Sequence, residues 1–128
     1  RFAEDQFVCW EAPYLHGRGE RRDEWNDYDS WVTPCALEQY NCYFPIDASA
    51  AKLIKAYLAL YRAEGRPDDL AKARALGDTA TRMQCPDGRI PTWWWPSRAS
   101  QVSADWINCM VATAEALGEL AALQETQE

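Results

Sequence analysis

The sequence of 128 residues has few of the patterns by which common enzyme and binding classes are identified. It contains one histidine, His16, in a charged stretch beside a glycine, where an exposed loop position accounts for it better than general-base chemistry. A Ser-His-Asp arrangement therefore has no support, and no glycine-rich phosphate loop occurs. No apolar run approaches the roughly 20 residues that span a bilayer, so we expect a soluble chain.

Positive charge is scarce. The chain has 13 lysines and arginines against 20 aspartates and glutamates, with a formal net charge of −7 and a pI near 4.7. Both a phosphate backbone and an anionic membrane surface require a positive face on the protein that binds them. We therefore expect neither nucleic acid nor a membrane as partner, and no pattern indicates a cofactor.

The cysteines form no metal-binding or disulfide pattern. There are five, an odd number, and none of their spacings is C-x-x-C, so a structural zinc site is not expected. Cys35 and Cys42 stand seven residues apart on a predicted helix, which separates them by about 10 Å, beyond disulfide reach. We expect the cysteines to be buried thiols.

The distribution of charged and aromatic residues divides the chain near residue 33. Residues 1–33 mix acids, arginines and three tryptophans without a period, and predict an irregular segment with one short helix. Residues 34–128 carry apolar residues at helical spacing and predict a domain of helical hairpins. With 48% apolar residues and the length of one domain, the chain is able to bury a core.

Three helices are predicted between residues 34 and 84. The first, over 34–44, follows from a Thr-Pro start and large apolar residues at helical spacing. The second, over 47–64, begins with Asp47 as its cap and ends at Gly65, and its apolar face is wide enough for burial on two sides. The third, over 67–84, opens with proline and two acids, and its short link to the second predicts an antiparallel hairpin.

The last helix is predicted over 104–123, after a cap at or near Ser103. The final five residues are polar and are expected to fray. The helical period places six apolar residues toward the core and two acids toward solvent. The expected inward residues are Ile107, Met110, Val111, Ala114, Leu117 and Leu120, and the outward acids are Glu115 and Glu119.

The stretch PDGRIPTWWWP, at residues 86–96, carries three consecutive tryptophans between two predicted helices. Pro-Asp-Gly makes a tight turn and the two later prolines disfavour helix before them, so the tryptophans are expected on extended backbone. Side chains alternate there, so Trp93 and Trp95 point to one side and Trp94 to the other. One side is expected to pack on helices while the other faces a ligand; alternatively, all three cover hairpin ends.

Three segments resemble the (α/α) toroids of the six-hairpin glycosidase superfamily: WVTPCALEQYNCYFPIDASAAKLIKAYLALY, ALGDTATRMQCPDGRIPTWW and DWINCMVATAEALGELAAL. The likeness covers residues 31–123. It implies an all-α fold of antiparallel αα-hairpins in which an aromatic connector enters a central cleft. A closed toroid has six hairpins and this chain has room for about two or three, so the resemblance implies an incomplete, C-terminal segment of a barrel. The remaining hairpins would belong to a longer chain or a partner subunit.

The connector and its neighbours predict a sugar-binding surface. Sugars present apolar C–H faces that stack on indole rings, while their hydroxyls bind acids, amides and arginines. Arg89 has the alternative of pairing with a nearby acid, and Asp87, before a glycine, is expected to bond its own backbone. The residues expected to contact a carbohydrate ligand are Trp93, Trp94, Trp95, Arg89, Tyr40 and Trp106.

Three acids are candidates for glycosidic bond hydrolysis, which needs a proton donor and a second carboxylate roughly 5 Å or roughly 6.5–9.5 Å apart. Glu38, Asp47 and Asp105 each stand near a predicted helix start, where helices open onto a cleft. We predict Glu38 and Asp105 as the catalytic pair, although Asp105 also suits the dipole of its own helix. Asp47 is interpreted as a helix cap.

The first functional hypothesis is a segment of a carbohydrate-active enzyme that hydrolyses glycosides through paired carboxylates. A non-catalytic helical docking or oligomerisation module is the second, favoured by the wide apolar face of helix 47–64. Isoprenoid cyclisation is the third, because cyclases of the other (α/α) toroid group carry similar turns. It would require an aspartate-rich motif in a greasy cavity, and the pair Asp68-Asp69 is expected to be solvated instead.

Overall fold

The computed structural model describes residues 2–11, 32–38, 45–94 and 106–127 of the chain. Within these ranges, four helices and two short strands follow one another as α1 (Phe2–Phe7), β1 (Val8–Cys9), β2 (Cys35–Ala36), α2 (Asp47–Glu64), α3 (Pro67–Met83) and α5 (Ile107–Gln127). The described part is therefore mostly helical, as expected for an all-α fold. No helix in it combines the length and the apolar character needed to cross a membrane.

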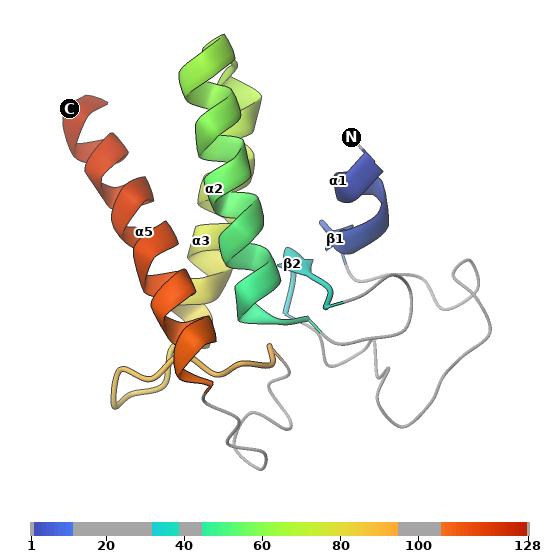
Figure 1. Ribbon diagram of the computed structural model, residues 1–128, viewed down its shortest axis with the longest axis vertical. Coiled ribbons are helices and arrows are strands. Elements are labelled where there is room, and N and C mark those ends of the chain that lie inside the picture. The colour runs from blue at the N-terminus through green and yellow to red at the C-terminus, as the bar shows by residue number, and fades with distance from the viewer. Residues whose placement is uncertain (1, 12–31, 39–44, 95–105, 128) are drawn as a thin grey trace.

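The three long helices stand side by side (Figure 1). α2 packs against both α3 and α5, which confirms that its wide apolar face is buried on two sides. α3 runs antiparallel to α2 after their short link, whereas α5 runs in the same direction as α2. The bundle is thus one helical hairpin with a further helix beside it.

The α2–α3 hairpin has the ends that the sequence predicts. Gly65 has a φ of 69°, a left-handed conformation that carries no steric penalty in glycine, and its N–H donates to the Tyr61 carbonyl at 2.8 Å. Pro67 occupies the first position of α3, where a missing N–H removes no helical hydrogen bond. The predicted bounds of both helices are confirmed to within one residue.

α5 buries only part of the face that was predicted: Leu120 is buried and Met110 and Leu117 are half-buried, as expected, but the rest is not. Ile107 and Val111, expected to face the core, are 69% and 50% exposed, and Ala114 is exposed as well. Because α5 is apolar on more than one face, its period alone does not decide which face meets α2. The helix also continues to Gln127, through residues expected to fray. Its buried residues are Cys109, Thr113, Ala116 and Leu120.

Two short strands attach the N-terminal residues to the bundle. β1 pairs with β2 in antiparallel register, with Cys9 opposite Cys35. The helix predicted over 34–44 is therefore wrong for residues 35–38. Short apolar runs suit strand and helix alike, and the pairing with β1 selects strand here. A hydrogen bond from the Ile46 N–H to the Ala36 carbonyl also favours the extended conformation of β2.

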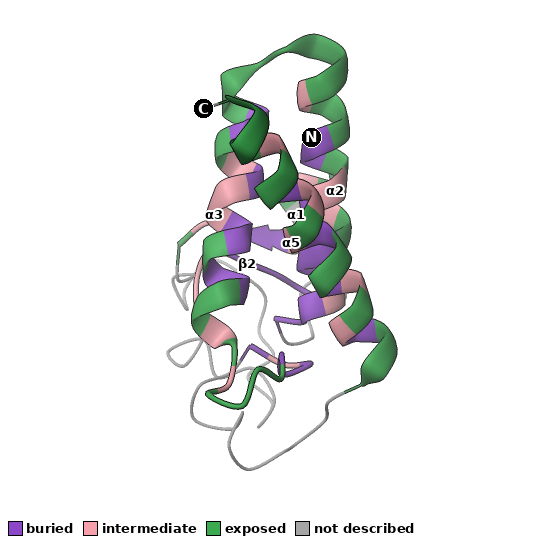
Figure 2. Ribbon diagram, turned by 90° about the vertical axis from the view of Figure 1, so that its left-hand side faces the viewer, coloured by how far each residue is buried: buried purple, intermediate pink, exposed green. Residues whose placement is uncertain are grey.

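The core has two parts, seen in Figure 2 as buried residues on the inward faces of the elements. One part joins the sheet, the start of α2, the end of α3 and the connector, and contains Cys9, Cys35, Ala36, Leu37, Ala50, Ala80 and Trp94. The other lies among the three long helices and contains Ala51, Ile54, Tyr57, Leu58, Leu70, Ala73, Leu76, Ala116 and Leu120. Alanines at these contacts allow the helices to approach closely.

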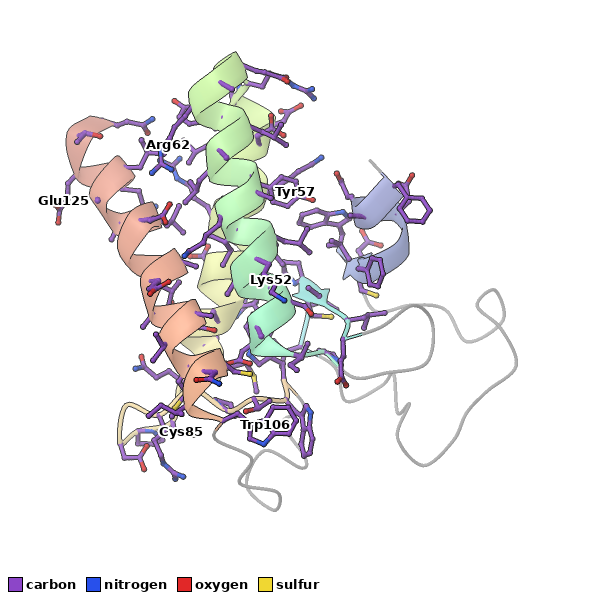
Figure 3. All side chains as sticks on the ribbon, in the orientation of Figure 1. Lys52, Tyr57, Arg62, Cys85, Trp106 and Glu125 are labelled. Carbon is purple, nitrogen blue, oxygen red and sulfur yellow. The ribbon has the colours of Figure 1, made fainter. Side chains whose placement is uncertain are left out.

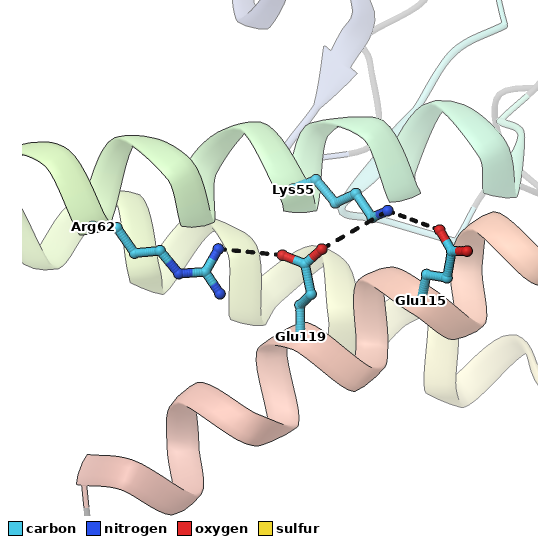
Figure 4. A network of polar contacts seen from close by, with 4 residues as sticks. All are labelled: Lys55, Arg62, Glu115 and Glu119. Atoms are coloured by element: carbon cyan, nitrogen blue, oxygen red, sulfur yellow. Dashed lines mark hydrogen bonds and ion pairs between the residues drawn. The ribbon is translucent and has the colours of Figure 1, made fainter.

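Charged side chains line the outer edge of the α2–α5 contact (Figure 4). Lys55 Nζ lies 2.9 Å from Glu115 and 3.8 Å from Glu119, and Arg62 lies 3.2 Å from Glu119. The hydrogen bond to Glu115 raises the pKa of Lys55. Because these pairs are open to solvent, each contributes little to stability.

Candidate functional site

The tryptophan connector is built into the end of the bundle where α2 and α5 begin. Trp93 forms a β-bridge with Ile46, the residue before α2. The Asp47 N–H donates to the Thr92 carbonyl at 2.9 Å. The connector is therefore paired with the chain that enters α2, and these contacts hold it in place.

The two described indoles of the connector, Trp93 and Trp94, differ in burial, as the predicted alternation requires. Trp94 is 0% exposed and belongs to the core beside the sheet. A ring with no exposed surface offers no face to a ligand, so the predicted sugar contact at Trp94 is corrected to a packing role. Trp93 is partly exposed.

Trp106, immediately before α5, lies at this end of the bundle (Figure 3) and contacts Trp93. The two rings meet edge to face, with centroids 6.3 Å apart and an interplanar angle of 61°. Trp106 is 53% exposed, and its backbone N–H donates to the Thr92 hydroxyl at 3.0 Å. Two predicted sugar contacts, 13 residues apart in the sequence, thus form one aromatic pair, in which Trp106 is half exposed.

Asp47 is completely buried at the first position of α2. Its carboxylate accepts a hydrogen bond from the Ala48 N–H at 2.7 Å and another from the Thr113 hydroxyl, on α5, at 3.3 Å. Burial raises the pKa of Asp47 from 3.8 to about 6, because these hydrogen bonds only partly offset the loss of water. The predicted role of Asp47 as the helix cap is wrong, because Ile46 is the N-cap and no side chain among the described residues caps the helix. Asp47 instead joins α2 to α5, with a pKa raised toward neutral.

Cys109, on α5, shares the environment of Asp47. Burial raises the pKa of the Cys109 thiol, the Asp47 and Glu38 carboxylates raise it further, and Lys52 opposes them. Glu38 therefore lies within electrostatic range of this end of α5. It is exposed in a bend after β2 rather than on the predicted helix, so its carboxylate is open to solvent.

Arg89 and Asp87 pair within the turn that precedes the tryptophans. Arg89 Nε lies 2.7 Å from Asp87 Oδ2, and the Arg89 backbone N–H donates to Asp87 Oδ1 at 3.1 Å. The side-chain hydrogen bond from Arg89 lowers the pKa of Asp87. Asp87 therefore bonds its own turn, as predicted, and Arg89 takes the alternative of pairing with an acid.

Several predicted residues fall in the part of the chain that the structure does not describe. Tyr40, Trp95 and Asp105, as well as His16, are outside the described residues. Asp68 and Asp69 were both expected to be solvated. Asp68 is exposed, as expected, but Asp69 is buried, at 4% exposed.

Sequence reasoning missed the residues that organise this end of the bundle, Thr92, Cys109 and Thr113. All three are buried, and each is a small polar residue within an otherwise apolar stretch. Cys109 and Thr113 stand one helical turn apart, so a polar stripe on α5 facing the start of α2 was the available signal. This stripe alone does not predict the contact, because the partner, Asp47, lies more than 60 residues away in the sequence.

Neither a metal centre nor a known relative identifies this site. Among the described residues, no group of three or more His, Cys, Asp or Glu side chains is placed to hold a metal ion. Comparison with known proteins gave no match: no family model fits the chain, and no curated protein or solved structure is significantly similar to it.

Proposed function

We propose that this chain is a helical segment of a carbohydrate-active protein, in which Trp93 and Trp106 form an aromatic surface for a sugar ring. One observation carries the proposal: the half-exposed Trp106 meets Trp93 edge to face, on a backbone tied to Thr92. An exposed indole with a fixed orientation is the group on which the apolar face of a sugar stacks.

The chemistry proposed for this surface is glycoside hydrolysis by two carboxylates. Glu38 supplies one, because it is solvent-exposed and lies within electrostatic range of Cys109 at the same end of the bundle. Asp105, next to Trp106 in the sequence, is the second candidate. Asp47 is a positioning residue, since its buried carboxylate joins α2 to α5 while its backbone N–H binds the connector.

The proposed architecture is an incomplete (α/α) toroid. Support comes from the order of the elements, a hairpin of two helices followed by a connector and a third helix parallel to the first. The exposed apolar residues of α5 add to it, because Ile107 and Val111 stand one turn apart on a face that the described residues leave open. A further helix of a toroid would cover that face.

Sugar binding is tested by titrating the isotopically labelled full chain with cellobiose, maltose and xylobiose and following the backbone amide signals. Trp106→Ala is expected to weaken the tightest of these interactions by about 2- to 12-fold, the range for losing one aromatic contact. Ile107→Ala is the matched control, because Ile107 is the next residue and is 69% exposed. It is expected to leave the affinity unchanged.

Two outcomes would contradict the proposal. The first is that none of the three disaccharides causes a saturable change in the folded protein. In the second, Trp106→Ala and Ile107→Ala weaken binding equally, which would mean that general apolar surface, rather than the indole, holds the sugar. Hydrolysis is assayed separately on 4-nitrophenyl glycosides, and Glu38→Gln is expected to abolish any activity that the chain shows.

A second candidate function is a helical docking or oligomerisation module, favoured by the outer face of α5. Ile107, Val111, Ala114 and Gly118 follow one another along that face at helical spacing, and all four are exposed. Sedimentation over a range of protein concentrations tests this alternative. Concentration-dependent association that Val111→Lys removes would support it, whereas a monomer at every concentration would contradict self-association.

A further inference from the structure

A pocket lies between α1, α2 and α3, away from the aromatic pair. Its volume is about 670 Å³. Tyr57 marks its place in Figure 3, where the side chain projects from α2 toward α1. Tyr57 stands ten residues after Asp47, which places the pocket about 15 Å along α2 from the proposed sugar surface. Its apolar wall is formed by Leu53, Ala56 and Leu60 of α2.

Asp69 Oδ2 is buried in the pocket wall without a hydrogen-bond partner among the described residues, on a residue that is 4% exposed. The Tyr57 hydroxyl, on a residue that is 5% exposed, interacts with the Glu4 carboxylate, and its oxygen is still able to accept a hydrogen bond. Arg66 Nε lies 3.7 Å from Asp69 Oδ2, which is an ion pair but is too long for a hydrogen bond. An unsatisfied buried polar atom is costly, so Asp69 Oδ2 favours a ligand that supplies the missing bond, and the Tyr57 oxygen is able to accept another bond from the same ligand.

Two of the other charges of the pocket are paired with each other. Glu4, on α1, lies 2.8 Å from Lys72 Nζ. Burial alone would raise the pKa of Glu4, but the hydrogen bond and charge of Lys72 outweigh it and lower the pKa. Burial raises the pKa of Tyr57, and the Glu4 and Asp69 carboxylates raise it further, so this hydroxyl keeps its proton across the physiological range.

The charge balance identifies the kind of ligand. Three carboxylates, Glu4, Asp5 and Asp69, line the pocket against two cations, Arg66 and Lys72. An anionic ligand would have to compete with carboxylates for both cations. A cationic ligand meets an incompletely satisfied carboxylate instead, and an ammonium group has the donors for a hydrogen bond to Asp69 Oδ2 and another to the Tyr57 oxygen.

We propose that this pocket binds a small organic ammonium compound, with its charged group between Asp69 and Tyr57 and its apolar body against Leu53, Ala56 and Leu60. Each part of the ligand matches a part of the wall. The ammonium forms a charge-assisted hydrogen bond with Asp69, and the hydrocarbon covers apolar surface on α2.

The test titrates the full chain, labelled with ¹⁵N, with n-butylammonium and separately with its neutral analogue 1-butanol. Saturable shifts are expected at the amides of Leu60, Asp69 and Lys72, with butylammonium binding about tenfold more tightly than butanol, the effect of one charge-assisted hydrogen bond. Asp69→Asn is expected to remove that preference. Asp68→Asn is the matched control, because Asp68 shares the first turn of α3 but is exposed and does not line the pocket.

The variants separate binding from helix stability. Both aspartates face the same helix dipole, so a general effect on the start of α3 would appear equally in Asp68→Asn and Asp69→Asn. Loss of the ammonium preference only in Asp69→Asn supports the proposal. Equal binding of butylammonium and butanol, no saturable shift at pocket amides, or equal effects of the two variants would each overturn it.

Discussion

Replacing Asp47 with asparagine tests whether this carboxyl is buried between α2 and α5. Asparagine keeps the size of the side chain, accepts a hydrogen bond from the Ala48 N–H and offers its amide to the Thr113 hydroxyl. The substitution therefore removes the ionisation and reverses the direction of the hydrogen bond with Thr113, and only the first change varies with pH. The expected result is that the free energy of unfolding of the variant, minus that of the wild type, becomes more positive as the pH rises.

The sign and magnitude follow from the raised pKa of Asp47. The pKa is about 6 in the folded protein against 3.8 ordinarily, so between these values the folded state binds more protons than the unfolded state. The contribution of Asp47 to stability is fully present below pH 3.8 and falls as the pH rises to 6. The whole change is about 3 kcal/mol, of which about 2 kcal/mol falls between pH 4.5 and 7.5.

The assay is urea unfolding, followed by circular dichroism at pH 4.5, 5.5, 6.5 and 7.5. The wild-type protein is expected to lose about 2 kcal/mol relative to Asp47→Asn over this range. An acid at a helix start with a lowered pKa would give the opposite sign, because the dipole stabilises its charge. A difference that is constant with pH, or that shrinks as pH rises, would refute the buried placement.

Three further comparisons test the packing. Trp94→Ala is expected to lower the free energy of unfolding by about 3–5 kcal/mol and Trp106→Ala by less than about 1 kcal/mol; equal losses would contradict the opposite placement of the two indoles. Ile54→Ala is expected to cost about 2–5 kcal/mol in urea unfolding and Leu60→Ala clearly less. Glu119→Gln is expected to lower the Tm in dilute buffer but not in 1 M NaCl; a salt-independent loss would argue against its ion pairs.

Local signals in the sequence were sufficient to predict the α2–α3 hairpin. Gly65 ends one helix and Pro67 begins the next through backbone conformation alone. The alanine-rich stripes mark the faces on which the two helices pack. The alternation of Trp93 and Trp94 was predictable for the same reason. These features depend on residues that are close together in the chain.

The features that the sequence did not predict depend on distant partners. β2 is a strand because β1 pairs with it, and neither segment is long enough to show a period. The buried face of α5 is chosen by contact with α2, because the helix offers apolar residues on more than one side. Asp47 was recognised as a helix start, but its burial depends on Thr113. The ammonium pocket likewise combines three helices and had no single sequence signal.

The most direct test of the proposed sugar surface follows the indole N–H signals of the tryptophans in the full chain during titration with a disaccharide. The account predicts that the signals of Trp93 and Trp106 move together and saturate at one concentration, while the signal of the buried Trp94 moves little. Movement confined to other tryptophans, or no saturable movement with any of the three disaccharides, would contradict it.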